Sequence, residues 1–89
     1  MNNKCYIIIY ELFPQRNVDD FHIAIKSYGT WAKINSNTWA VVTSNSAIEV
    51  RDNLKRYLTP SDRIFVVKSG IEAAWINAEC SNEWLKNNL

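Results

Sequence analysis

The stretch that decides the fold is residues 4–17, KCYIIIYELFPQRN, an apolar run that ends at a glutamate and a proline-containing break. Its β-branched and aromatic side chains lack helical spacing, which predicts a strand over residues 5–12. Successive strand side chains alternate between two faces. The two sets are Cys5, Ile7 and Ile9 on one face and Tyr6, Ile8 and Tyr10 on the other. Because both sets are apolar, we expect both faces to be covered.

The rest of the chain alternates between helix and strand patterns. Apolar residues at helical spacing predict helices over residues 18–28 and 47–58, the first capped by Asn17 and the second opened by a capping box at residues 46–49. Further strands are predicted over residues 30–35, 38–43 and 63–68, with a tight hairpin turn joining the first two. In the tail we expect a short strand near residues 73–76, then a short helix opened by Ser81 or Asn82.

This β-α-β-β-α-β order predicts an α+β, ferredoxin-like domain with a four-stranded antiparallel sheet. All 89 residues form one domain, with a core over about residues 4–69 and a C-terminal strand and helix extension over residues 70–89. The first and third strands are then central, and both helices cover one face. The other face stays open and apolar, which is typical of an interface. We therefore predict a homodimer packed sheet against sheet, with the extension contributing, the alternative being that the extension alone covers this face.

Charge and composition exclude some classes of partner. The formal net charge is +1, which argues against binding to nucleic acid by a strongly basic face. The start of the chain lacks a long apolar segment, and the longest apolar run, residues 5–10, is too short to span a bilayer. We expect a cytoplasmic protein with no membrane partner. Cys5 and Cys80 are then free thiols, the alternative being one disulfide that joins the two ends.

Glu11, at the end of the predicted first strand, is the leading candidate for chemistry. Near a dimer axis, two copies of its carboxylate would be the minimum needed to hold Mg²⁺ for phosphodiester hydrolysis. The alternative is an ordinary solvated carboxylate at a strand end. Arg16 in the following loop and Lys33 on an edge strand are candidates for nucleic-acid contacts, the alternative again being a solvated surface.

The histidine and tryptophan residues favour simpler interpretations. His22 is the only histidine, and no nucleophile is placed opposite it, so we expect it to be solvent-exposed and without a role. The four tryptophans have the chemistry to stack on bases. Their positions on strands and the last helix instead favour packing in the core or an interface. The sequence has neither a glycine-rich phosphate loop nor a Cys/His metal motif.

Three stretches carry a resemblance to a known family. They are YIIIYEL at residues 6–12, GTWAKINSNTWAVVTSNSAIEVRDNL at 29–54 and DRIFVVKSGIEAAW at 62–75. Over residues 6–85 the chain resembles the SinR-family or CRISPR-adaptation-like proteins, short bacterial and phage proteins. That family looks like the small dimeric ferredoxin-fold subunit of the CRISPR spacer-integration complex and like the virulence-associated D toxins.

The resemblance implies a dimer with a carboxylate near its axis. The relatives carry a Tyr-Asp pair at the end of the first strand, where this chain has Tyr10-Glu11. Some relatives cleave RNA or DNA with a divalent metal, which here implies an endonuclease with Glu11 on Mg²⁺ and Arg16 on phosphate. In the integration complex the subunit is a structural bridge, which implies a non-enzymatic adaptor or binding module in a defence, mobile-element or toxin–antitoxin context. A third function, small-nucleotide binding, needs a pocket that the sequence does not locate.

Overall fold

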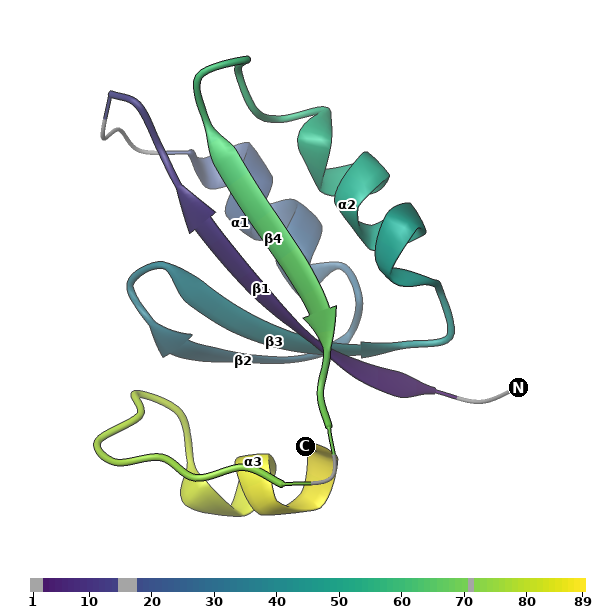
Figure 1. Cartoon of the computed structure of the whole chain (residues 1–89), viewed down its shortest axis with the longest axis vertical. Helices are drawn as coiled ribbons and strands as arrows, with labels where there is room; N and C mark the ends of the chain where they lie inside the picture. Colours follow the sequence, from purple (N-terminus) through teal and green to yellow (C-terminus); the bar gives the residue numbers. More distant parts are fainter. Residues whose placement is uncertain (1–2, 15–17, 71) are drawn as a thin grey trace.

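The strand β1, Lys4–Glu11, lies inside the sheet and pairs with neighbours on both of its sides. The computed structural model describes residues 3–14, 18–70 and 72–89 (Figure 1). The other strands are β2 (Thr30–Asn35), β3 (Thr38–Thr43) and β4 (Arg63–Lys68). The sheet has the order β2-β3-β1-β4, and all neighbouring pairs are antiparallel. As predicted, this is an α+β fold with the first and third strands central, and it is consistent with the ferredoxin-like class.

Two helices, α1 (Asp19–Lys26) and α2 (Ala47–Lys55), lie on one side of the sheet (Figure 1). Both are shorter than predicted because their last apolar residues, Tyr28 and Leu58, lie in tighter turns whose hydrogen bonds join residues three apart. The turn after α1 ends at Gly29, whose φ of 88° favours glycine. The residue at the N-cap of α1 is Val18, and the predicted cap Asn17 lies outside the described residues. In the described part of the chain, no helix is long and apolar enough to cross a membrane.

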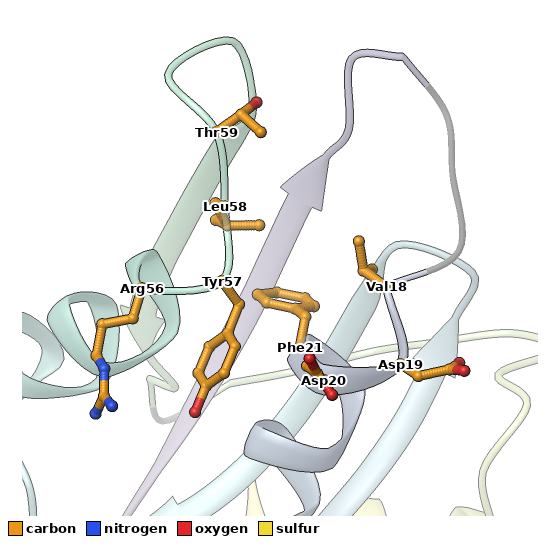
Figure 2. A pocket seen from close by; sticks show the side chains of 8 residues that line it. All are labelled: Val18, Asp19, Asp20, Phe21, Arg56, Tyr57, Leu58 and Thr59. Atoms are coloured by element: carbon orange, nitrogen blue, oxygen red, sulfur yellow. The ribbon is translucent and has the colours of Figure 1, made fainter.

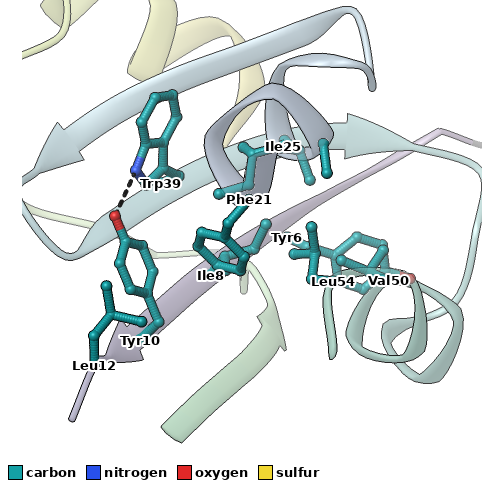
Figure 3. Packing of buried hydrophobic residues seen from close by; sticks show 11 residues of the cluster. Tyr6, Ile8, Tyr10, Leu12, Phe21, Ile25, Trp39, Val50 and Leu54 are labelled. Atoms are coloured by element: carbon teal, nitrogen blue, oxygen red, sulfur yellow. Dashed lines mark hydrogen bonds between the residues drawn. The ribbon is translucent and has the colours of Figure 1, made fainter. Parts of the chain in front are cut away.

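The main core lies between the sheet and these two helices (Figure 3). Ile8, at the centre of β1, is fully buried there. The strands supply Tyr6, Ile8, Tyr10, Trp39 and Val41, and the helices supply Phe21, Ile25, Val50 and Leu54. The even-numbered side chains of β1 therefore face the helices, so its odd-numbered side chains face the other side of the sheet.

The C-terminal tail covers half of that other face. The backbone N–H of Glu79 donates a hydrogen bond of 2.9 Å to the carbonyl of Ile34 on β2, and Figure 1 shows the tail lying beside that strand. Ala32, Ala40 and Leu85 are buried although none belongs to the helix-side core. Their burial indicates that the tail and its helix α3 (Asn82–Asn88) pack over the β2–β3 half of the sheet.

The strand predicted near residues 73–76 is wrong. Residues 73–75 are irregular, and the chain bends at residues 76 and 77, where Asn77 has a left-handed φ of 57°. This conformation ends an extended run, and asparagine tolerates it better than most residues. The indole N–H of Trp75 instead donates to Oδ1 of Asn82, 3.0 Å away. The short final helix is confirmed, and the Oγ of Ser81 caps it by accepting the N–H of Trp84.

Cys5 and Cys80 are free thiols, as predicted. Cys5 is buried, and this burial raises the pKa of its thiol, while a hydrogen bond with Ser69 lowers it. A buried thiol with a raised pKa carries little of the thiolate that makes cysteine reactive. We therefore assign Cys5 a packing role.

The capping box of α2 gives a direct test of the local fold. Oγ of Ser46 accepts the N–H of Glu49, and Oε1 of Glu49 accepts the N–H of Ser46. Ser46→Ala is expected to lower the free energy of unfolding by about 1 kcal/mol, because the N–H of Glu49 loses its acceptor. Urea denaturation followed by tryptophan fluorescence measures the change. The control is Ser44→Ala at an exposed neighbouring position, and equal effects of the two substitutions would contradict the capping role.

Candidate functional site

An apolar strip remains open on the β1–β4 half of the sheet face that the tail does not cover. Ile7 pairs with Val67 and Ile9 pairs with Phe65 across the two strands. Ile9 is 43% exposed, Phe65 60% and Val67 42%. We call Ile7, Ile9, Phe65 and Val67 the open strip. The predicted open apolar face is therefore confirmed for half of the sheet, because the chain's own tail covers the other half.

The open strip ends at an ion pair between Glu11 and Arg63. These residues are partners in the β1–β4 register, and Nη1 of Arg63 donates to Oε1 of Glu11 at 2.8 Å. The Arg63 guanidinium also lies 4.9 Å from the ring centroid of Phe13. A hollow of about 530 Å³ adjoins the pair and is lined by Ile9, Tyr10, Glu11, Asn37, Arg63, Ile64 and Phe65. The carboxylate of Glu11 therefore stands at the rim of an apolar surface.

The surroundings of Glu11 do not fit Mg²⁺ within one chain. A guanidinium already donates to its carboxylate at 2.8 Å, and a second cation beside Arg63 would be repelled. Magnesium also needs several oxygen ligands in near-octahedral geometry. Among the described residues, no group of three or more histidine, cysteine or acidic side chains is placed to hold a metal. The geometry of the single chain agrees with the alternative that Glu11 is a surface carboxylate.

The structure does not bring the predicted site residues together. Arg16 lies outside the described residues. Lys33 lies on β2 opposite Trp39, hence on the helix side of the sheet, whereas Glu11 lies on the open side. The Nζ atom of Lys33 is 3.8 Å from a carboxylate oxygen of Glu79 in the tail. Glu11 and Lys33 therefore belong to two separate surfaces.

His22 is partly buried, so the prediction that its side chain is solvent-exposed is wrong. Its Nε2 lies 2.9 Å from the hydroxyl of Tyr10, and its ring stacks on Trp39 with centroids 5.6 Å apart. The hydroxyl of Tyr10 donates to the carbonyl of Ser36 at 3.1 Å. It also accepts the indole N–H of Trp39 at 3.3 Å, the bond drawn in Figure 3. The hydroxyl of Tyr10, on β1, therefore makes polar contacts with α1, with β3 and with the turn between β2 and β3.

This network assigns the tautomer of His22. The hydroxyl of Tyr10 has a single proton, and the carbonyl of Ser36 can only accept it. The contact between Tyr10 and Nε2 of His22 therefore needs the proton to come from the histidine. We infer that Nε2 carries a hydrogen and that Nδ1 is the nitrogen that titrates.

His22 also lines a second candidate site, which sequence reasoning missed. A hollow of about 260 Å³ is lined by His22, Lys26, Trp31, Lys33 and Trp39, and we call it the basic aromatic hollow. The Nζ atom of Lys26 lies 5.2 Å from the ring centroid of Trp31 and 6.0 Å from that of Trp39. Two sequence spacings pointed to this site. His22 and Lys26 are four residues apart on one helix face, and Trp31 and Lys33 are two residues apart on one strand face. Spacing alone could not show that these two faces meet.

A third hollow, of about 530 Å³, lies between the start of α1 and the turn after α2 (Figure 2). Val18, Phe21 and Leu58 are among the residues that line it. Figure 2 shows the side chains of Asp19 and Arg56 pointing away from each other rather than converging. A site for chemistry needs polar groups that converge on one point, so we assign no chemistry to this hollow.

The pH dependence of stability provides a test of the His22 environment. Burial lowers the pKa of His22, the charges of Lys33 and Lys26 lower it further, and Asp19 raises it. A lowered pKa in the folded state gives stability that is complete above the unfolded pKa of about 6.5 and is lost as the pH falls below it. The wild type is therefore expected to lose stability from pH 7.5 to 5 more steeply than His22→Gln. Urea denaturation across this range measures the difference, and parallel curves would contradict the assignment.

No family model matches the chain, and no curated protein or solved structure matches it either. The resemblance to the SinR-family proteins therefore stays a prediction. The functional conclusion rests on the two surfaces described above, the open strip with its ion pair and the basic aromatic hollow.

Proposed function

We propose that the chain is a non-enzymatic homodimeric binding module of ferredoxin-like fold, in which two open strips meet. The observation that carries this proposal is the paired exposure of Ile9 and Phe65 next to Val67 on the open side of β1 and β4. A contiguous apolar patch on a small domain is typical of an interaction site. A second copy of the chain supplies the same apolar patch, as a twofold interface requires.

The ion pair at the end of the open strip is compatible with such an interface. Glu11 and Arg63 carry opposite charges side by side, and both side chains are at least half exposed. A twofold axis near this point would bring opposite charges of two copies together, with Arg63 of each chain able to meet the carboxylate of the other. Because each copy presents both a positive and a negative group, the ion pair favours association with a second copy of the chain.

An adaptor accounts for the geometry of Glu11 better than a nuclease does. The guanidinium of Arg63 bonds to the carboxylate that the nuclease hypothesis needs for Mg²⁺. One observation favours the nuclease as the second candidate, namely the place of Glu11 at the rim of the proposed interface, where both Glu11 carboxylates would lie near the axis together with both Arg63 side chains. The resemblance of residues 6–85 to SinR-family proteins agrees with either function. It adds the expectation of a cytoplasmic role in defence, mobile elements or toxin–antitoxin systems.

Sedimentation equilibrium of the wild type tests the dimer. At micromolar concentration we expect a mass of twice 10.3 kDa. A monomer of 10.3 kDa under these conditions would overturn the proposed interface.

A nuclease assay separates the two functions. RNA and DNA are incubated with the wild type, Glu11→Ala and the matched control Glu83→Ala, each with Mg²⁺ or Mn²⁺. No metal-dependent cleavage is the expected result for an adaptor. Cleavage that Glu11→Ala abolishes and Glu83→Ala retains would replace the adaptor by the enzyme.

A further inference from the structure

We propose that the basic aromatic hollow binds a free nucleoside monophosphate, with its base against Trp31 and its phosphate between Lys26 and Lys33. This inference goes beyond the proposed dimer and is independent of it. The hollow lies on the helix side of the sheet, where Trp31 and Lys33 face Val41 and Trp39, whereas the open strip lies on the opposite side.

The basic groups of the hollow converge on one small space. His22, Lys26 and Lys33 reach it from α1 and β2 and line the same hollow of about 260 Å³. In the described part of the chain, no carboxylate is within ion-pair distance of Lys26. Its Nζ is held instead against the faces of Trp31 and Trp39. The ammonium of Lys26 is therefore positioned without being neutralised, which is the state that suits an anion.

The aromatic side of the hollow is only partly used by the protein. Trp39 is buried and its indole N–H bonds to Tyr10, whereas Trp31 is 37% exposed. The two indoles are tilted, with centroids 5.4 Å apart. An exposed indole next to a cationic group offers a π-face for a base beside a charge for its phosphate, and every nucleobase has such a face.

Size and charge favour a mononucleotide over a longer strand. The hollow of about 260 Å³ lies just below the range of about 300–1,000 Å³ of small-molecule sites, so it has room for no more than one nucleotide, part of which stays outside it. The carboxylate of Glu79 lies 3.8 Å from Nζ of Lys33, at the tail side of the hollow. A second phosphate continuing along β2 would approach this negative charge. The proposed site therefore favours a single phosphate between Lys26 and Lys33 over a chain of phosphates that passes Glu79.

Calorimetric titration with AMP, GMP, CMP and UMP tests the proposal, with adenosine, inorganic phosphate and a ten-nucleotide poly(U) as comparison ligands. We expect at least one monophosphate to bind with a Kd below 1 mM. Adenosine lacks the phosphate and inorganic phosphate lacks the base. Each is therefore expected to bind at least tenfold more weakly than AMP. Lys26→Ala and Lys33→Ala are expected to weaken binding at least tenfold, with Lys55→Ala on α2 as the control of equal charge change.

The single histidine gives an independent readout by NMR. Tyr10, Lys26, Lys33 and Asp19 are the titratable groups that face His22. A bound phosphate is expected to raise the pKa of His22, because an anion favours the imidazolium form.

Substitution of Trp31 tests the stacking of the base. Trp31→Phe keeps an aromatic ring and is expected to retain binding, whereas Trp31→Ala is expected to lose it.

Three results would overturn the proposal. One is that none of the four monophosphates binds below 1 mM. Another is that poly(U) binds and the monophosphates do not, which would make the hollow a contact for single-stranded nucleic acid. The last is that Lys55→Ala weakens binding as much as Lys26→Ala does. Lys26 and Lys33 lie away from the open strip. Sedimentation of Lys26→Ala and Lys33→Ala therefore tests the dimer independently of nucleotide binding.

Discussion

Phe65→Asp is expected to convert the protein from a dimer to a monomer of 10.3 kDa. Phe65 is the most exposed member of the open strip at 60%, and in a dimer its ring would lose contact with water. Burying a phenylalanine side chain contributes about 1.5–3 kcal/mol, and aspartate would in addition leave a buried charge. We expect the dimer dissociation constant to rise at least about 100-fold, since each 1.4 kcal/mol changes affinity about tenfold. Sedimentation velocity over a concentration series measures the change.

The control for Phe65→Asp is Ile48→Asp on α2. Ile48 is 62% exposed, close to the value for Phe65, but it lies on the helix side of the fold. The control adds the same charge at a similarly exposed apolar position, so it is expected to leave the dimer intact. Far-ultraviolet circular dichroism of both variants checks that they fold. If Ile48→Asp dissociates the dimer while Phe65→Asp does not, the interface lies on the helices and the open strip has another role.

Phe21→Ala is expected to lower the free energy of unfolding by about 3–5 kcal/mol, because it leaves a cavity in the main core. Phe21 is fully buried, and its ring meets that of Tyr10 edge-on with centroids 4.7 Å apart. A domain of 89 residues has a total stability of only about 5–13 kcal/mol. This one substitution therefore removes a large part of the total. Denaturation curves of wild type and variant at equal protein concentration measure the loss.

Ile23→Ala on the same helix is the matched control for Phe21→Ala. Ile23 is 63% exposed, so its truncation is expected to change stability by less than about 0.5 kcal/mol. A loss below about 1.5 kcal/mol for Phe21→Ala would show that the core collapses around the missing ring and that the packing in Figure 3 is not rigid.

The architecture was accessible from the sequence because its signals are local. The continuous apolar run of β1, the helical spacing of Phe21 and Ile25, and the capping box at Ser46 each report on a few neighbouring residues. The element order then leaves few ways to build a sheet. The tail was less predictable, since the left-handed backbone at Asn77 ends an apolar run that looks like a strand.

The candidate sites were less accessible because they depend on which faces meet. Glu11 and Arg63 are 52 positions apart, and only the β1–β4 register places them side by side. His22 shares a helix face with charged residues, so its sequence pattern is that of a solvated surface. Its actual environment comes from Trp39, whose large ring reaches it from β3. Long-range side-chain contacts of this kind leave no periodic signal in the sequence.

The hydrogen bond from Glu79 to Ile34 has a consequence for how copies of the chain assemble. It occupies a backbone carbonyl on β2, one of the two outermost strands, whereas the tail residues that the structure describes make no backbone hydrogen bond to β4. A sheet whose two margins are both available for pairing can add copies without limit, as fibrils do. A sheet with one margin partly blocked by its own chain pairs more readily with a second copy through the other margin. Such edge-to-edge pairing is separate from the proposed face-to-face dimer, and the tail contact restricts it to one margin, which lowers the risk of filaments that an uncovered apolar strand brings.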